Sequence, residues 1–227
     1  APAYEEAAQV AAELAQMPDV EVTAAPVALV FDYASDWAWE TQPQGRDFDY
    51  FRLCLHLYQG LRKLGLSVDI LPPDTADLGA YRLVLAPAVA TLSQPLLNAL
   101  HAFQGIALLG PRTNAKTTDF ATPVPLPPNL PGLPCTVARV ESLPPDLPVP
   151  LADGGAFLHW REKCESPDAT EHTIDGWPAI VGNGPLRYLA GWPDDTARDR
   201  ILATLCAELG LQTEALPDGL RRRDTST

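Results

Sequence analysis

Hydrophobic residues near the amino terminus recur at intervals of three and four, which predicts an amphipathic helix over residues 4–16. From residue 27 onward, short continuous apolar runs alternate with amphipathic stretches. The first run, over 27–33, is rich in β-branched and aromatic residues and is typical of a strand buried on both faces. We expect a loop over 34–46, and then a helix that Asp47 caps and Gly65 ends.

This alternation of strand and helix continues to residue 109. Further strands are expected at 67–71, 81–86 and 106–109, and a helix that Ser93 caps and Gly105 ends precedes the last of them. Strands that alternate with helices pair in parallel through right-handed crossovers. The first half therefore predicts an open, doubly wound sheet in a flavodoxin-like order, with the first strand central.

The second half has a weaker pattern. Prolines are dense over 122–150, which favours loops and edge strands, with one strand expected at 136–141. Two apolar runs on either side of Asn183-Gly184 predict a β-hairpin. A last helix is expected over 194–209. The predicted fold class is α/β, an open and mostly parallel sheet with helices on both faces and a C-terminal β-hairpin.

Composition narrows the possible partners. The 227 residues can bury a proper core, and their formal net charge of −13 repels phosphate backbones, so no nucleic acid partner is expected. No apolar run approaches the roughly 18 residues that a membrane span requires. The four cysteines form no C-x-x-C pair, and the four histidines do not sit beside them at ligand spacing, so we expect no metal site. Such thiols indicate a reducing compartment, and we expect a cytoplasmic protein.

The segment after the first strand lacks the residues of a nucleotide site. A dinucleotide would need a glycine-rich turn there, and a flavin would need a phosphate loop, but the chain has Asp32-Tyr33-Ala34-Ser35-Asp36. No cofactor is therefore expected.

The turn at 110–114 bears on enzymatic function. Class I amidotransferases share this strand-helix order and carry a nucleophilic cysteine at the comparable turn, where this chain has Arg112. A nucleophile also needs a base within reach. A degenerate relative of such enzymes stays an alternative.

Three carboxylates cluster near the end of the first strand, at Asp32, Asp36 and Glu40. Glycoside hydrolysis needs two carboxylates about 5 to 10 Å apart in a rigid cleft. Helix capping, or pairing with Arg46 or Arg112, is the favoured interpretation of these acids. We predict no catalytic residue in this chain.

Aromatic and basic residues gather in the first long loop and in the turn at 110–116. Seven of them are candidates for contact with another subunit, since such interfaces are enriched in Trp, Tyr and Arg: Trp37, Trp39, Arg46, Phe48, Tyr50, Arg112 and Lys116. A local minicore that covers the sheet edge would use the same aromatic residues, and a sugar-stacking platform is a third possibility. Salt-bridge formation is the favoured role for the two cations of the turn.

Four stretches, taken in order, resemble the middle domain of glycoside hydrolase family 42 β-galactosidases. They are Val-Phe-Asp-Tyr-Ala-Ser-Asp-Trp-Ala-Trp-Glu (30–40), Gln-Pro-Gln-Gly-Arg-Asp-Phe-Asp-Tyr (42–50), Gly-Leu-Ser-Val-Asp-Ile-Leu (65–71) and Gly-Pro-Arg-Thr-Asn-Ala-Lys-Thr-Thr-Asp-Phe (110–120). Two departures are Asn114, where the family usually has glycine, and Gln104-Gly105, which shortens the usual Ala-Gly-Gly. Asn tolerates the left-handed conformation nearly as well as glycine.

The resemblance implies a flavodoxin- or amidotransferase-like trimerisation domain over 22–216. Residues 1–21 would be a linker helix from a missing catalytic barrel, and 217–227 a tail entering a missing C-terminal β-domain. The family's catalytic glutamates lie in the barrel, so none is carried over. The absence of an initiator Met suggests a processed protein or a piece of a longer one. We expect a homotrimer that also contacts the barrel, with a carbohydrate-binding module as the main alternative.

Overall fold

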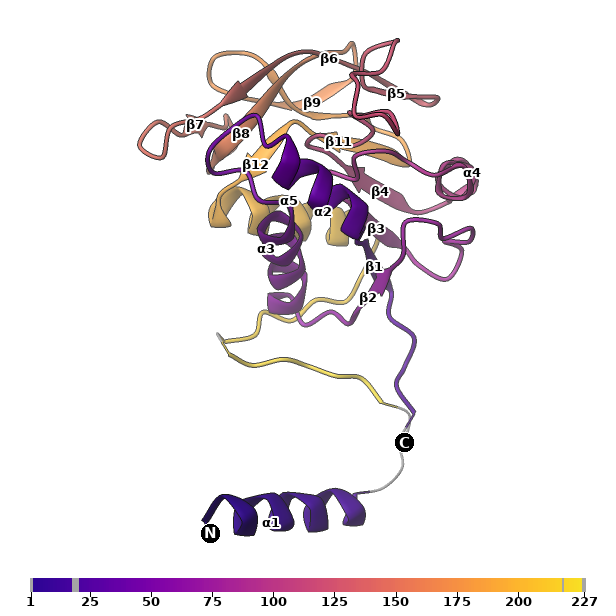
Figure 1. The fold of residues 1–227 in the computed structure, drawn as a ribbon, viewed down its shortest axis with the longest axis vertical. Helices are drawn as coiled ribbons and strands as arrows, with labels where there is room; N and C mark the ends of the chain where they lie inside the picture. Colours follow the sequence, from indigo (N-terminus) through magenta and orange to yellow (C-terminus); the bar gives the residue numbers. More distant parts are fainter. Residues whose placement is uncertain (1, 18–20, 218, 226–227) are drawn as a thin grey trace.

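The computed structural model describes residues 2–17, 21–217 and 219–225, which form a mixed α/β structure (Figure 1). The helices are α1 (Pro2–Gln16), α2 (Tyr33–Thr41), α3 (Tyr50–Lys63), α4 (Gln94–Ala102) and α5 (Asp195–Glu208). The strands are β1 (Val27–Val30), β2 (Val68–Leu71), β3 (Leu83–Ala86), β4 (Ile106–Leu109), β5 (Pro128–Leu130), β6 (Leu133–Ser142), β7 (Val149–Pro150), β8 (Ala156–Glu165), β9 (Ala169–His172), β10 (Pro178–Val181), β11 (Leu186–Leu189) and β12 (Gly191–Pro193).

Within these residues the strands form two sheets. The larger sheet has the order β2-β1-β3-β4-β11-β10-β9, and neighbouring strands are parallel from β2 to β11 and antiparallel from β11 to β9. β1 thus lies between β2 and β3 rather than at the centre of the sheet. The predicted mostly parallel sheet and the β10–β11 hairpin are confirmed.

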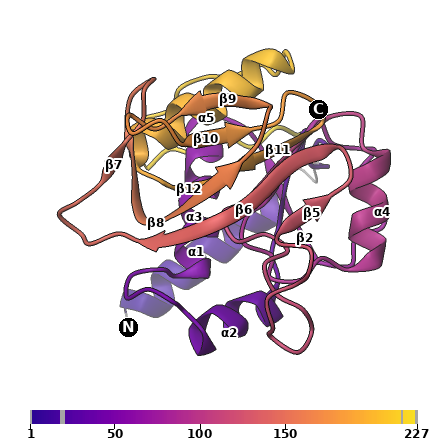
Figure 2. The same cartoon turned by 90° about the horizontal axis from the view of Figure 1, so that it is seen from above.

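The second sheet lies above the first and is antiparallel, with the order β12-β8-β6-β5 and β7 paired to β8 (Figure 2). The sequence pattern predicted only a part of β6 and none of β8. Both strands have ten residues; the burial of β6 alternates only over 133–138, and that of β8 does not follow a simple alternation. The mixed pattern reflects contact with both the larger sheet and solvent.

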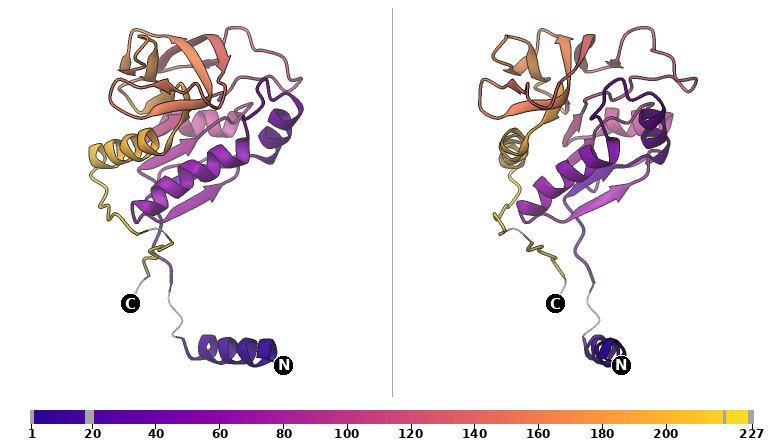
Figure 3. Two further views of the ribbon diagram at one scale, coloured as in Figure 1. Left: turned by 90° about the vertical axis from the view of Figure 1, so that its left-hand side faces the viewer. Right: turned by 60° about the vertical axis from the view of Figure 1, so that its left-hand side comes forward.

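The parallel strands β1, β3 and β4 are buried on both faces, as continuous apolar runs require, whereas β2 at the edge is partly exposed. One face, which includes Leu29 and Leu85, packs with α3, α5 and the aromatic residues of β8. The other face, which includes Val30 and Ala86, packs with α4 and the apolar residues of β6. Helices therefore cover both faces, and the second sheet closes the carboxyl end (Figure 3).

Helix starts follow local capping. Asp49 accepts from the backbone of Arg52 and caps α3, so the prediction that Asp47 caps this helix is wrong. Ser93 caps α4 and Asp194 caps α5. The expected loop over 34–46 is also wrong in part, because the Asp32 carboxylate accepts from two backbone N–H groups and starts α2.

Residues 22–23, which lead into the body of the domain, lie side by side with residues 224–225. Val22 pairs with Thr225, and the Thr23 N–H donates to the Asp224 carbonyl at 3.0 Å. α1 lies apart from the body and buries none of its residues (Figure 1). The paired segments 22–23 and 224–225 lie at the amino end of the parallel strands, away from the second sheet (Figure 3).

Replacing Leu85 by Ala tests the central packing. This side chain is fully buried between the sheet and its helices, so we expect Leu85→Ala to lower the free energy of unfolding by about 2–5 kcal/mol. Urea titration followed by circular dichroism measures it. Leu147→Ala is the matched control, because Leu147 is exposed, and should change the value by at most about 0.5 kcal/mol. Equal losses in both variants would contradict this description of the core.

Candidate functional site

The turn after β4 has an unusual backbone. Gly110 has a φ of +77° and lies so close to the Leu189 carbonyl that a Cβ atom would be 2.4 Å from it. Arg112 and Asn114 also have positive φ values, of 65° and 56°. Thr113 secures the turn, since its hydroxyl accepts from Gly110 N–H and donates to the Ala86 carbonyl, each at 2.8 Å. The turn therefore directs Arg112 to one fixed place beneath the second sheet.

The Arg112 guanidinium is enclosed by three aromatic rings. Its Cζ atom lies 3.7 Å from the Trp39 ring centroid and 4.5 Å from those of Phe48 and Trp160. Only 1% of the residue is exposed. Cation–π attraction is stronger where water is excluded, so these rings offset part of the cost of burying the charge.

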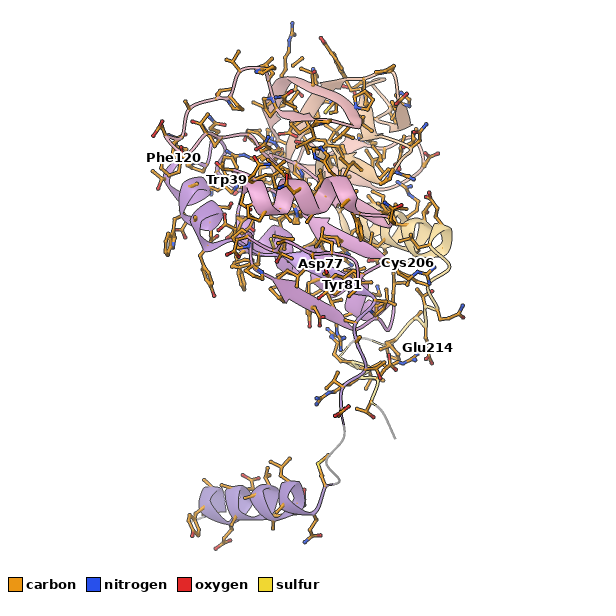
Figure 4. The ribbon with its side chains drawn as sticks, turned by 90° about the vertical axis from the view of Figure 1, so that its right-hand side faces the viewer. Trp39, Asp77, Tyr81, Phe120, Cys206 and Glu214 are labelled. Carbon is orange, nitrogen blue, oxygen red and sulfur yellow. The ribbon has the colours of Figure 1, made fainter. Side chains whose placement is uncertain are left out.

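The edge of the guanidinium binds the segment that follows α2. Its Nη1 donates to the Pro43 carbonyl at 2.7 Å, and its Nη2 donates to the Gln42 carbonyl at 3.1 Å. Lys116 extends the same contact, because its Nζ donates to Gln42 Oε1 at 2.6 Å and to the Phe120 carbonyl at 3.2 Å. Trp39 and Phe120 accordingly lie on the same side of the molecule (Figure 4). Arg112 and Lys116 thus hold the segment after α2 against the turn after β4.

Glu162 on β8 is the buried acid of the site. It accepts from the Arg112 backbone N–H at 3.1 Å, the Trp160 indole at 3.4 Å and the Tyr188 hydroxyl at 2.7 Å. Burial raises the pKa of Glu162, although these donors and the Arg112 charge oppose the change. Burial also lowers the pKa of Arg112 to about 10 and lowers that of Lys116. Arg112 therefore stays charged at neutral pH.

The ionisable side chains at this site are packed and hydrogen-bonded within the chain. Arg112, at the turn that the sequence compared with the amidotransferase nucleophile, is packed and hydrogen-bonded. The described cysteines are buried free thiols, and burial raises the pKa of Cys54 to about 12 and that of Cys206 to about 11. A protonated thiol is a poor nucleophile. Among the described residues, no group of three or more His, Cys, Asp or Glu is placed to hold a metal.

The carboxylates near the end of β1 cap the start of α2 or lie on that helix. Both oxygens of Asp32 accept from the first turn of α2 at 3.0 Å, which is the predicted capping role. Asp36 is half-buried, and burial followed by the charge of Glu40 raises its pKa. These acids belong to the start and the outer face of one helix.

The structure divides the seven predicted interface residues into two groups. Trp39, Phe48, Tyr50, Arg112 and Lys116 are buried within the chain, in agreement with the minicore alternative. Trp37 is 63% exposed, and the Arg46 side chain is 90% exposed beside Asp47. Contact of any of the seven with another subunit stays a prediction.

Sequence reasoning missed the contribution of β8. Trp160 and Glu162 complete the site, but no strand was predicted over 151–177. The available signal was weak: aromatic residues at 157 and 160 are followed by charged residues, and Trp160 stands two positions before Glu162. A pocket of about 230 Å³ lies beside Arg112, Lys116 and Arg139, between the segment after α2 and the second sheet.

Comparison with known proteins gives a consistent match. Residues 25–212 match the family described as the β-galactosidase trimerisation domain. A β-galactosidase of Thermus thermophilus is 42% identical, and the alignment covers 98% of this chain and 35% of that protein. The β-galactosidase BgaA of a Thermus species is 44% identical over 96% of this chain and 35% of its own length. The chain thus spans about a third of these relatives.

Solved structures match the fold. The β-galactosidase from the psychrophilic Marinomonas ef1 superposes with a TM-score of 0.86 at 36% identity, over 96% of this chain and 34% of that one. The polyextremophilic β-galactosidase of the Antarctic haloarchaeon Halorubrum lacusprofundi gives 0.87 at 32% identity, over 97% and 36%. Among the described residues, no helix is long and apolar enough to cross a membrane.

Substitution of Arg112 by Lys tests whether the site requires a planar guanidinium that donates to two carbonyls at once. A lysine keeps the charge, but it cannot lie flat against three rings while donating to two carbonyls. We expect Arg112→Lys to lower the free energy of unfolding by about 1–3 kcal/mol, because half-buried acceptors lose their donors. The exposed Arg46→Lys should change it by at most about 0.5 kcal/mol. Equal stability of the two variants in urea would contradict the assigned role.

The buried acid predicts a specific pH dependence. Since the pKa of Glu162 is raised in the folded state, its contribution is complete below the unfolded value of about 4.5 and is lost as pH rises through the folded pKa. Stability of the wild type relative to Glu162→Gln should therefore fall as pH increases above about 4.5. Urea titrations at several pH values measure this difference.

Glu141 supplies a control of opposite sign. Hydrogen bonds from Lys163 at 2.6 Å and from Arg161 lower the pKa of Glu141. Its contribution is present above the unfolded pKa and is lost as pH falls. Stability relative to Glu141→Gln should therefore rise with pH. The same sign for both variants would show that the local environments are misassigned.

Proposed function

Because the chain belongs to the family of β-galactosidase trimerisation domains, we propose that it is a non-catalytic domain that joins three copies of a β-galactosidase-like enzyme. The parent would hydrolyse terminal β-D-galactosides at a site outside this chain. The observation that carries the proposal is the family match over residues 25–212, in a chain that spans 35% of related β-galactosidases.

The filled turn after β4 supports a structural role. The Arg112 side chain and its aromatic neighbours occupy the carboxyl end of the sheet, where open α/β enzymes usually bind their ligands. The parallel order β2-β1-β3-β4-β11 also supports the finer fold assignment, a flavodoxin-like or amidotransferase-like sheet. The free cysteines agree with a reducing, cytoplasmic setting.

The domain boundaries follow from the same proposal. Residues 1–21 would form a linker from the catalytic barrel, and α1, which buries none of its residues here, would pack on that barrel. Residues 22–216 would be the trimerisation domain, and 217–227 would lead to a small C-terminal β-domain.

A carbohydrate-binding module is the second candidate, because Trp37 is exposed. Its support is limited, since Trp39 is buried and donates its indole N–H to the Ala88 carbonyl at 2.6 Å. One exposed indole offers a single stacking face. Tryptophan fluorescence titrated with lactose distinguishes the candidates: a saturable change that Trp37→Ala abolishes would favour the binding module.

Light scattering at increasing protein concentration tests trimerisation directly. We expect the mass of three chains, without hydrolysis of a nitrophenyl β-galactoside above the buffer rate. The trimer should persist better at moderate salt than at low salt, because each copy carries a formal charge of −13 and salt screens the repulsion between copies. A monomer at every concentration, or turnover of the galactoside, would contradict the proposal.

A further inference from the structure

Five large apolar side chains are exposed together at one edge of the larger sheet. They are between 39% and 67% exposed and form what we call the edge patch: Tyr33, Trp37, Phe51, Leu55 and Ile70. Isolated exposed apolar residues are ordinary, but contiguous sets usually mark an interaction surface.

Helical spacing and ring contacts join these residues. Tyr33 and Trp37 are one turn apart on α2, and Phe51 and Leu55 are one turn apart on α3, so each pair shares a helix face. The half-buried Phe31 links the two helices, since its ring centroid lies 5.0 Å from that of Tyr33 and 6.1 Å from that of Phe51. The patch is therefore continuous from α2 to α3.

The patch also contains a hollow that could receive a side chain. A groove of about 270 Å³ lies among Tyr33, Phe51, Leu55 and Ile70, and Leu29 forms part of its floor. Its lining is almost wholly apolar. A shallow apolar groove of this size suits one large hydrophobic anchor from a protein partner.

Core packing within the chain does not account for these residues. α3 directs a complete apolar face into the core through residues such as Leu53, Leu57 and Leu61, and Phe51 and Leu55 lie outside that face. β2 is the outer strand of its sheet and pairs only with β1 among the described residues, so Ile70 stands at an unpaired edge. The exposed residues of β2 are Asp69 and Ile70, and no described part of the chain covers Ile70.

We infer that the edge patch binds a second copy of this chain and is one side of the subunit contact, an inference that rests on the proposed trimerisation. The position of the chain ends favours this occupant over other parts of the same polypeptide. The Val22–Thr225 pair, from which flanking domains would continue, lies at the amino end of β1, whereas the patch lies beside the carboxyl ends of β1 and β2. A closed ring of three uses two different surfaces per copy, and the patch is one of them.

The surroundings of the patch fit a protein contact. Arg46 and Arg52, both largely exposed, lie in the segment that leads into α3 and in its first turn, and they supply a polar rim. Each lies 3.8 Å from a carboxylate of its own chain, that of Asp47 or Asp49, so the rim presents both signs of charge to a partner.

Ile70→Lys tests the inference with Ile174→Lys as its matched control. Both isoleucines are more than half exposed, but Ile174 lies in the turn after β9, outside the patch. Sedimentation equilibrium should show the wild type and Ile174→Lys as trimers of equal affinity, and Ile70→Lys with association weakened by at least about tenfold. Phe51→Asp should give the same loss, and unchanged circular dichroism melting would show that each variant folds.

Each outcome has a distinct meaning. A trimer that tolerates both Ile70→Lys and Phe51→Asp would overturn the edge patch as the contact while leaving the trimerisation proposal in place. A wild-type chain that stays monomeric at every concentration would overturn both. Equal weakening by Ile174→Lys would attribute the effect to added charge and would also overturn the assignment.

Discussion

Burial of the Arg112 guanidinium determines how the second sheet and the segment after α2 are held at the carboxyl end of the larger sheet. Arg112 joins three segments that are distant in the sequence: the turn after β4, the segment after α2 and strand β8. Isolated burial of a charge would cost several kcal/mol, so the cation is stable there only because stacking and hydrogen bonding satisfy it. Every one of those partners must be in place together, which makes the end of the sheet a cooperative unit.

In the part of the chain that the structure describes, more cationic than anionic side chains are buried, although the chain as a whole is acidic. Among the described residues, Arg112, Lys116, Arg161, Arg187 and Arg198 are buried, against only Glu162 and Glu171 among the acids. The exposed surface is therefore more negative than the formal charge alone indicates. Association of such surfaces depends on apolar contact and on the few cations left outside, so electrostatics selects orientation rather than supplying most of the affinity.

Sequence patterns were sufficient where a local rule determined the structure. Continuous apolar runs gave the parallel strands, and Ser93 and Asp194 marked their helices correctly. The rules failed where tertiary contacts determined the structure. In β8, for example, the order of buried and less buried residues does not follow the alternation expected of a strand. The aromatic and basic residues of the site were recognised, but not that Trp39 and Trp37, two positions apart on one helix, face opposite environments. Helix α2 itself was missed, and with it the difference between those two faces.

The body of the domain begins and ends at neighbouring points, because the Thr23 N–H donates to the Asp224 carbonyl. A domain of this kind can be inserted into another protein as a unit. Segments on either side would leave from almost the same point, so their separation would not depend on what lies between them. Domains whose ends meet in this way tolerate insertion into a host and circular permutation. Recombination could therefore transfer this unit between proteins of different architecture, or remove it, without forcing the flanking segments apart.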